Sequence, residues 1–358
     1  MPLSTIHQKW TLITPDDSRW DQYVAKHAHG TAFHTSSLIR AFANTPTFSL
    51  FAYAALNADG EIVAMLVSVH VKTLRRLTSL SSRAIQFAEP LCNDHVEGQA
   101  ALSHLIAEHD AFMGPRSLLC EIRSIQSPCC EQVPLLAAGY SRCDYINFVV
   151  DLNKSKDQLW RNVKKNMRQK INCTAKNGIV VRDDNSLDGV SRLYQLLAYS
   201  YGRSRVPLAP QSLFENTLAS APPGMVRIRT AFENEKPVAS IISLLYRGRV
   251  FSWYGGTLRL KGRSPFASIV WGDIEWAAEN GYSIYDFGGA GWPNDDYGPR
   301  RFKASFGGEE MHFGRYCLTY SPYRLKIAEF AYRISRRLGT WSSPSRHVNE
   351  PEHANKDE

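Results

Sequence analysis

Two periodicities of apolar residues alternate along the chain. Continuous apolar and β-branched runs at 48–56 and 61–72, and again at 226–233 and 238–246, are separated by short polar turns and predict two β-hairpins. Elsewhere apolar residues recur three and four positions apart, which is the spacing of one helical face. The predicted helices cover 98–112, 159–176, 187–201, 265–280 and 323–338. This alternation of strands with helices predicts an α/β fold with mixed sheets (α+β).

Both halves of the chain show the same order of elements, namely hairpin strands followed by a strand, a helix and a strand. A length of 358 residues fits two domains, since one domain usually takes roughly 100–200 residues. We predict the boundary where a strand ends at Asp151 and a basic helix follows, which gives domains over 1–150 and 151–340. The polar stretch 341–358 is predicted to be a disordered tail.

Composition and charge narrow the class of protein. With 44% hydrophobic residues the chain can build a sizeable core, which excludes a disordered or disulfide-scaffold protein. The net charge of +8 is concentrated, because segment 154–176 alone contributes +7 and segment 323–338 contributes +4. The remainder is therefore mildly acidic, and the two basic segments predict an anionic partner such as tRNA, phosphate or lipid.

The seven cysteines have no regular spacing, and neither C-x-x-C nor H-E-x-x-H occurs. We therefore expect reduced thiols in a cytoplasmic protein and no metal site. The first residues lack the apolar core of a secretory signal, and the longest apolar stretch, Ile62–Val71, is too short to span a membrane. Helix 323–338 has one apolar face, so it either docks on the core or makes peripheral contact with an anionic inner membrane.

A glycine-containing loop precedes the helix at 265–280. Ser264 is a suitable N-cap and Pro265 a suitable first helical residue. Helix N-termini bind phosphate through free N–H groups, and Arg259 and Arg263 add charge on either side of Gly262. The segment is thus either a cradle for the pyrophosphate of an acyl donor or a basic surface loop with a good cap.

Two further segments combine glycines with an ionisable residue. Asp286 lies at a strand end before Gly288 and Gly289, where it could accept a proton from an amine or bond its own backbone in a turn. Lys303 lies between Phe302 and Phe306. An ammonium shielded by aromatic rings can stabilise a developing oxyanion, although composition alone favours an exposed lysine in a basic turn.

The predicted helix 159–176 carries basic residues at helical spacing. Arg161, Lys164, Lys165 and Arg168 follow the i, i+3, i+4, i+7 pattern and would share one face. Such a face suits a nucleic-acid backbone, while a solvated helix surface is the alternative explanation.

Taken in order, these segments resemble the FemAB-type branch of the GNAT acyltransferase superfamily over about residues 150–320. Residues 1–150 match more weakly, through Phe33-His34-Thr35-Ser36 and Phe87-Ala88-Glu89-Pro90. The segments that carry the resemblance are Leu159-Trp160, Lys176-Asn177-Gly178-Ile179-Val180, Tyr201-Gly202-Arg203, Tyr254-Gly255-Gly256, Tyr285-Asp286-Phe287-Gly288-Gly289 and Phe302-Lys303-Ala304-Ser305-Phe306-Gly307-Gly308.

The resemblance implies two tandem GNAT-like domains and an enzyme that transfers an acyl group to an amine, with no metal and no covalent intermediate. It assigns the oxyanion to Lys303 and an anionic acceptor to Arg203, and Asp286 or the substrate takes the proton. The other expected site residues are Tyr254, Tyr285 and Phe302 at the substrate and Arg259, Gly262, Arg263, Ser264, Lys164, Lys165 and Arg168 at the donor.

Three functions remain open at this point. Transfer from aminoacyl-tRNA to a cell-envelope precursor of the peptidoglycan type, or to a small metabolite, is favoured because the basic helix and the family branch agree. An acetyl-CoA-dependent N-acetyltransferase of polysaccharide biosynthesis is the close alternative. The third is a non-catalytic, anion-binding envelope protein. In both enzyme hypotheses the acyl donor is a co-substrate and no cofactor stays bound.

Overall fold

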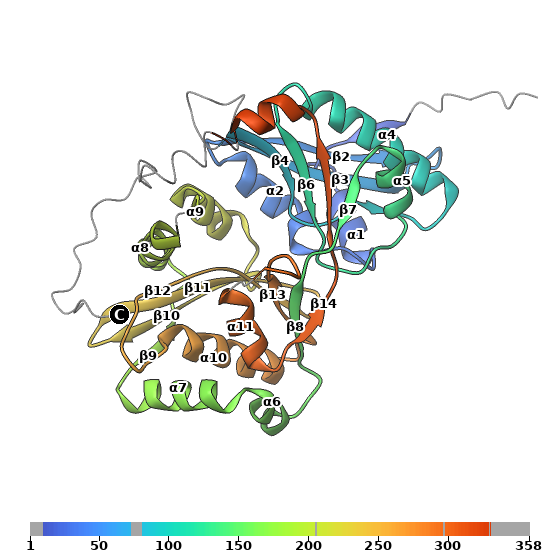
Figure 1. Cartoon of the computed structure of the whole chain (residues 1–358). Coiled ribbons are helices and arrows are strands. Elements are labelled where there is room, and N and C mark those ends of the chain that lie inside the picture. Colours follow the sequence, from blue (N-terminus) through green and yellow to red (C-terminus); the bar gives the residue numbers. More distant parts are fainter. Residues whose placement is uncertain (1–9, 73–80, 205, 296–297, 329, 331–358) are drawn as a thin grey trace, which may run out of the picture.

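The computed structural model describes residues 10–72, 81–204, 206–295, 298–328 and 330, and contains two mixed β-sheets with helices on their faces (Figure 1). The strand order is β1-β2-β3-β4-β6-β15-β7 in the first sheet, where β5 also pairs with β3, and β14-β8-β13-β12-β11-β10-β9 in the second. The predicted mixed α/β fold is confirmed.

Strand bounds in the first sheet are β1 (Thr11–Ile13), β2 (Phe48–Leu56), β3 (Ile62–Lys72), β4 (Ser82–Gln86), β5 (Leu91–Cys92), β6 (Leu119–Arg123), β7 (Ser141–Cys143) and β15 (Arg315–Thr319). Those in the second are β8 (Asn147–Asp151), β9 (Val180–Asp183), β10 (Val226–Glu233), β11 (Lys236–Tyr246), β12 (Arg249–Thr257), β13 (Ile284–Gly289) and β14 (Glu309–Met311). The predicted hairpins are β2–β3 and β10–β11, both antiparallel.

The two sheets exchange strands, so no single position in the chain separates them. β8 follows β7 but pairs with β13 and β14 in the second sheet. β15 follows β14 but is inserted between β6 and β7 in the first sheet. The predicted domain boundary after residue 150 lies within β8. The division of the chain into two domains at this point stays a prediction. The sheets themselves interlock at two crossings (Figure 1).

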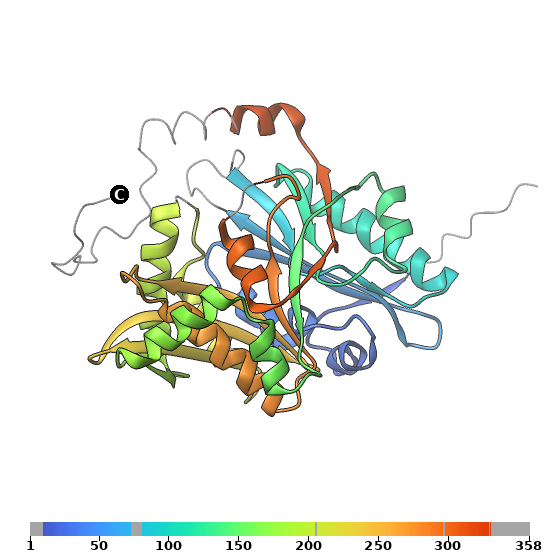
Figure 2. The ribbon, with the colours of Figure 1, turned by 60° about the horizontal axis from the view of Figure 1, so that its bottom comes forward.

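Helices cover the sheets on several sides (Figure 2). Beside the first sheet lie α1 (Arg19–Lys26), η1 (Ala32–His34), α2 (Ser36–Ala43), α4 (Val96–Met113) and α5 (Gln132–Ala137). Beside the second lie α6 (Lys156–Asn162), α7 (Lys165–Lys176), α8 (Leu187–Ser204), α9 (Gln211–Ser220), α10 (Pro265–Glu279), α11 (Gly298–Lys303) and η2 (Ala304–Phe306).

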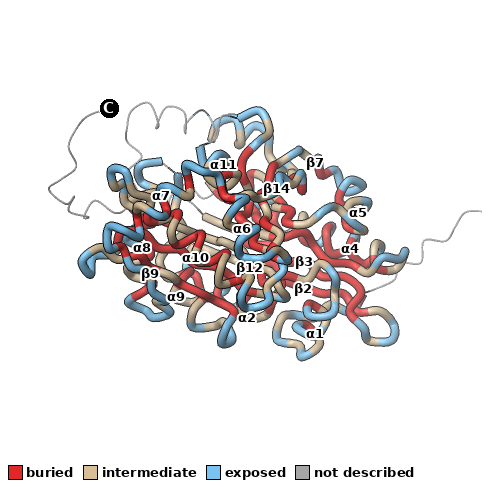
Figure 3. Tube along the Cα trace, turned by 90° about the horizontal axis from the view of Figure 1, so that it is seen from below, coloured by how far each residue is buried: buried red, intermediate tan, exposed pale blue. Residues whose placement is uncertain are grey.

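The second sheet is buried on both faces because its side chains alternate between two cores. Ile241 packs with α6, α7 and α10, whereas its neighbour Ile242 packs with α8, α9 and α2. Since α2 comes from the beginning of the chain, the latter core joins the two sheets. In Figure 3 the strands and the inner faces of the helices are buried and the rim loops exposed.

The predicted helix 159–176 is wrong in one respect, because it is two helices. Val163 is extended (φ −65°, ψ 129°) and buried between α6 and α7. The backbone N–H of Lys164 donates to the carbonyl of Ser305, 2.8 Å away, and so leaves the helical hydrogen-bond pattern. Arg161 consequently lies on a different helix from Lys165 and Arg168, and the four basic residues do not share one helical face.

The beginning of the predicted helix 323–338 is present, with residues 322–328 helical. Its apolar residues Tyr323 and Ile327, together with Phe330, are exposed. Positions 331–338 and the predicted tail 341–358 lie outside the described residues. Among the described helices, none combines the length and apolar character that crossing a membrane requires.

Candidate functional site

A cavity of about 800 Å³ lies where the two sheets meet. In each sheet a parallel strand pair, β4–β6 or β12–β13, is paired at only three positions and then separates. Residues beyond both separations are among those that line the cavity. Those that follow the first pair are Phe87, Arg123, Ser124 and Ile125, and those that follow the second are Ser252, Trp253, Tyr254, Phe287, Gly288 and Gly289.

Lys303 lines this cavity at the opening between β12 and β13. Its Nζ donates to the carbonyl oxygens of Phe287 (2.5 Å) and Gly289 (2.8 Å). Burial lowers the pKa of Lys303 to about 8, against the opposing effect of the nearby Asp286 carboxylate. Two close carbonyls therefore fix the ammonium in place. Its third N–H has only the more distant carbonyl of Gly288, at 3.5 Å, as a partner, and this weak bond is the one that a ligand in the cavity would replace.

Asp286 is fully buried on β13 and is not among the residues that line the cavity. Its carboxylate accepts hydrogen bonds from Arg249 (2.6 Å) and from the backbone N–H of Gly288 (2.7 Å). Burial raises its pKa, while Arg249 acts in the opposite direction. These contacts favour a role in holding the end of β13 in place over direct proton transfer.

The residues expected at the substrate lie in different surroundings. Tyr254 lines the cavity, next to Tyr201. Tyr285 is fully buried and packs against Phe287, and Phe302 packs between Phe266 and Phe306. Neither Tyr285 nor Phe302 is among the residues lining the cavity.

Arg203 is exposed near the end of α8, where its guanidinium lies over the Tyr199 ring at 5.6 Å. Its neighbours Tyr201 and Gly202 line the cavity, but Arg203 is not among the lining residues. The expected acceptor arginine therefore lies beside the site that contains Lys303 and not within it.

The expected donor loop also lies outside the cavity lining. The N–H of Ser264 donates to Thr174 Oγ1 (2.9 Å), the N–H of Arg263 donates to the carbonyl of Leu260 (3.3 Å), and Pro265 has no N–H. The Arg263 side chain forms an ion pair with Glu233. Several donors expected at a phosphate therefore already have partners within the protein.

The donor loop is nevertheless connected to Lys303 through aromatic contacts. Phe266, two residues after Ser264, packs against Phe302 with ring centroids 5.6 Å apart, and Phe302 precedes Lys303. A Cβ at Gly255 would lie 2.4 Å from the Phe266 ring, so glycine is needed there for α10 to approach β12. The start of α10 therefore abuts the strand whose neighbouring residues line the cavity.

The basic residues expected at the donor differ in availability. Lys164 and Lys165 are exposed at the start of α7. Arg168 instead donates to the carbonyls of Trp160 (3.2 Å) and Arg161 (2.8 Å) at the end of α6. The guanidinium of Arg168 thus links α7 to the end of α6 and is less available to a ligand than the exposed lysines.

The positive charge of the cavity was not predicted from the sequence. Apart from Lys303, the lining contains Lys72, Arg83, Arg123 and Arg315, and no acidic residue among the described ones. These residues come from β3, β4, β6 and β15, and no local motif marks them. Only the order of the strands in the sheet brings these residues to one surface, so they could be found only by predicting that order.

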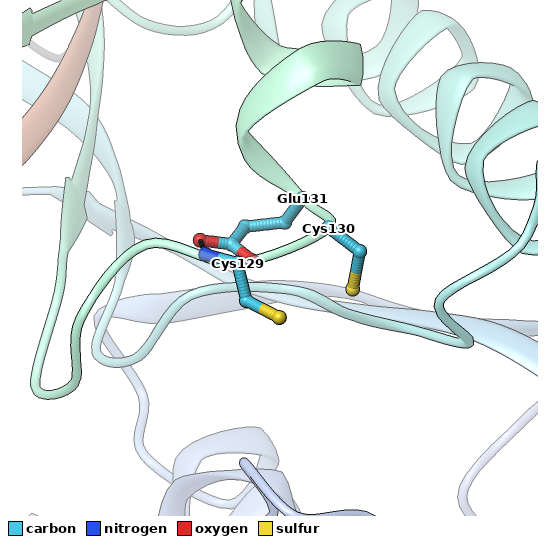
Figure 4. Close-up of side chains that lie close together, drawn as sticks. All are labelled: Cys129, Cys130 and Glu131. Carbon is cyan, nitrogen blue, oxygen red and sulfur yellow. Dashed lines mark hydrogen bonds between the residues drawn. The ribbon is translucent and has the colours of Figure 1, made fainter.

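Among the described residues, one group has ligand atoms close enough together for a metal ion: Cys129, Cys130 and Glu131, all within 4.8 Å (Figure 4). Both carboxylate oxygens of Glu131 already accept from the N–H of Cys129, at 3.0 and 3.1 Å. The group does not line the cavity. It therefore supplies no metal to the site that contains Lys303.

The chain is similar in sequence to an acetyltransferase domain family and in fold to several solved structures. Residues 161–303 match the acetyltransferase (GNAT) domain family. The crystal structure of FemX aligns over 91% of this chain and 99% of its own, with 13% identity and a TM-score of 0.64. A tandem GNAT protein from the clavulanic acid biosynthesis pathway aligns over 88% and 99%, with 11% identity and a TM-score of 0.56.

A third structure is the C-terminal domain of a putative lysylphosphatidylglycerol synthetase from Agrobacterium fabrum. It aligns over 92% of this chain and 98% of its own, with 14% identity and a TM-score of 0.55. Among curated proteins, none matches the sequence. The alignments confirm the expected tandem GNAT fold, and the family match confirms the expected class of enzyme.

Proposed function

We propose that this chain, an acyltransferase that resembles the FemAB-type branch of the GNAT superfamily, transfers an acyl group to the amine of an anionic acceptor in the cavity between its sheets. Lys303 carries the proposal: a buried ammonium fixed by two carbonyls, at the opening of a parallel strand pair, in a cavity without acidic side chains among its described residues. Such a donor stabilises negative charge strongly because little water competes with it.

The proposed reaction is a direct acyl transfer. The lone pair of the acceptor nitrogen forms the C–N bond, and the carbonyl oxygen of the donor takes up negative charge beside Lys303. The bond to the carrier oxygen or sulfur then breaks with its electron pair, and the carrier is released with the proton that the nitrogen loses. Lys303 must be protonated to act in this way, so we expect the rate to fall as pH rises through about 8.

For the donor we favour aminoacyl-tRNA. Lys165 and Lys170 of α7 and Lys261 of the loop before α10 are exposed, and this loop is joined to α7 by the hydrogen bond from Ser264 to Thr174. The N–H groups of Arg263 and Ser264 have internal partners, which weakens the loop as a pyrophosphate cradle of the ordinary GNAT kind. A nucleic-acid backbone needs only distributed positive charge.

Acyl-CoA is the second candidate donor, and the match of residues 161–303 to an acetyltransferase domain family supports it. For the acceptor, the family resemblance supports an amine of a cell-envelope precursor of the peptidoglycan type. The exposed apolar residues Tyr323 and Ile327 are compatible with such a precursor at a membrane surface, which is where we propose peripheral contact.

One assay tests this function and separates the donors. Purified protein is incubated with labelled acetyl-CoA or with charged tRNA and a panel of amines, at a series of salt concentrations. Transfer from charged tRNA that weakens steeply with salt supports the first donor, and transfer from acetyl-CoA with a shallow dependence supports the second. Binding of either donor without transfer to any amine would indicate the non-catalytic, anion-binding alternative.

A further inference from the structure

We propose that Arg83, Arg123 and Arg315 form a binding site for a phosphate group of the acceptor, on the side of the cavity that belongs to the first sheet. The inference rests on the proposed function and narrows its substrate class to amines that carry a phosphoryl or diphosphoryl group. It takes over the role that the sequence had suggested for Arg203, which is not among the residues lining the cavity.

The three arginines share one face of the first sheet although they are far apart in sequence. They lie on neighbouring strands β4, β6 and β15. Arg315 is directly opposite Arg123, and Ile85 pairs with Glu121. Because side chains alternate along a strand, Arg83 shares a face with Ile85, and Arg123 shares that face with Glu121. All three residues therefore line the cavity from the same face of the first sheet.

The cluster has more positive than negative charge. Glu121 accepts from Arg123 Nε at 2.6 Å and from Arg315 at 3.0 Å. Burial alone would raise the pKa of Glu121, but Arg123 and Arg315 lower it to about 2. Arg83 makes no hydrogen bond or ion pair within the described part of the chain. Three guanidinium groups around one carboxylate leave about two positive charges unbalanced.

Such an arrangement is unfavourable without a ligand. Like charges directly opposite each other on antiparallel strands destabilise a sheet. Desolvation and the charge of Arg123 lower the pKa of Arg83, while the carboxylate of Glu121 acts in the opposite direction. A dianion would remove this repulsion, and a phosphate group supplies two charges with acceptors pointing in several directions.

Aromatic rings support two of the arginines. The guanidinium of Arg315 stacks 3.5 Å from the ring centroid of Tyr145, and that of Arg123 lies 5.4 Å from the centroid of Phe87. Stacking restrains the guanidinium plane, while the hydrogen bonds to Glu121 use only part of its five donors. The remaining N–H groups are available to a tetrahedral anion.

The ring of Tyr145 also connects this site with Lys303. A Cβ at Gly289 would lie 2.6 Å from the Tyr145 ring, so the ring rests against that backbone. The carbonyl of Gly289 is in turn an acceptor for Lys303. Tyr145 therefore contacts both the arginine cluster, through Arg315, and the backbone that holds the ammonium. An acceptor whose phosphate binds the arginines can bring its amine to the carbonyl held at Lys303.

Phosphate binding by the protein without a donor tests the inference. Inorganic phosphate and pyrophosphate are titrated calorimetrically and by thermal unfolding, at constant ionic strength with chloride as the balancing anion. We expect both to raise the Tm of the wild type. Arg83→Gln should weaken binding by about tenfold or more, since it removes a charged hydrogen-bond partner. Without phosphate its Tm should equal or exceed that of the wild type.

Two variants serve as controls. Arg40→Gln removes an exposed arginine of α2 outside the cavity and should bind phosphate like the wild type. Arg83→Lys retains the charge without the planar guanidinium and should bind phosphate with intermediate affinity. This variant keeps the site testable if Arg83→Gln does not fold. Undiminished binding in Arg83→Gln, equal loss in Arg40→Gln, or equal stabilisation by malonate would overturn the phosphate site.

A last comparison separates this inference from the proposed function. Lys303→Ala protein should still bind phosphate, so a failure of acyl transfer leaves the anion site testable. In the transfer assay, a phosphate-bearing amine should have a lower KM than the same amine without phosphate, and Arg83→Gln should remove that difference. Equal KM values in the wild type would show that the cluster binds free phosphate and not the acceptor.

Discussion

In both sheets a parallel strand pair separates after three paired positions, and residues beyond both separations line the same cavity. The two openings between the separated strands present different side chains to the cavity. The first sheet contributes arginines from three neighbouring strands, and the second contributes a lysine from α11 held by backbone carbonyls. The strand separation that both sheets share thus accounts for the cavity. The side chains divide this cavity into an anion-binding part and a part suited to acyl transfer.

A buried acid lies beside each opening, and the two acids differ in their partners. Glu89 near the first opening accepts from the N–H of Ile125 (3.1 Å), and Asp286 near the second accepts from the N–H of Gly288. Asp286 also has an ion pair with Arg249, while burial raises the pKa of Glu89 to about 8. Burial raises the pKa of both acids, but the carboxylate at the second opening is paired with an arginine, whereas Glu89 forms no ion pair with any described residue.

Asp286→Asn should have the largest effect on stability. The substitution leaves Arg249 mostly buried without its ion pair, and breaking a buried pair in this way costs about 3–5 kcal/mol. Chemical denaturation measures the loss, with exposed Asp59→Asn as a control that should change stability by less than about 0.5 kcal/mol. A stable Asp286→Asn protein that has lost transfer would instead assign proton transfer to this residue.

Glu89→Gln sharpens the contrast between the two acids. A folded-state pKa of about 8, above the usual value of 4.5, means that the wild type loses stability as pH rises from about 5 to 8. The glutamine variant lacks this dependence, so its stability relative to the wild type should increase by up to a few kcal/mol over that range. Denaturant unfolding at pH 5 and pH 8 measures it, and parallel pH profiles would contradict a neutral Glu89.

The donor surface should show a smaller effect. Replacing Lys165 and Lys170 by glutamine removes two exposed cations of α7, so the slope of the salt dependence of tRNA binding should fall by about one for each phosphate that these lysines neutralise. The matched control is Lys156→Gln on α6, since Lys156 is already paired with Glu275 at 2.6 Å. Filter binding at several salt concentrations measures both, and an unchanged slope would favour acyl-CoA.

The sequence predicted the parts of this structure that depend on local pattern. The hairpins β2–β3 and β10–β11 follow from apolar runs broken by polar turns. Lys303 was singled out because the motif that contains it and the neighbouring motifs resemble those of the FemAB-type branch. The break at Val163 could not be foreseen, because no glycine or proline marks it and its cause is a hydrogen bond from Lys164 to Ser305, far along the chain.

The arginine cluster was beyond sequence reasoning for a related physical reason. Arg315 and Arg123 are opposite each other only because β15, the last strand of the described chain, is inserted into the first sheet. Arg203 was a natural choice for the acceptor because it follows Tyr201 and Gly202 in one motif. Since α8 continues to Ser204, however, Arg203 lies on an exposed turn of that helix.

The division of the cavity is tested most directly by measuring kcat and KM for a phosphate-bearing amine in Lys303→Ala and Arg83→Gln. Loss of the oxyanion donor should lower kcat by roughly 10²–10³ with little change in KM. Loss of the phosphate partner should raise KM about tenfold, more than it lowers kcat. Near-normal kcat in Lys303→Ala, or the same change in both variants, would contradict two separate roles in one cavity.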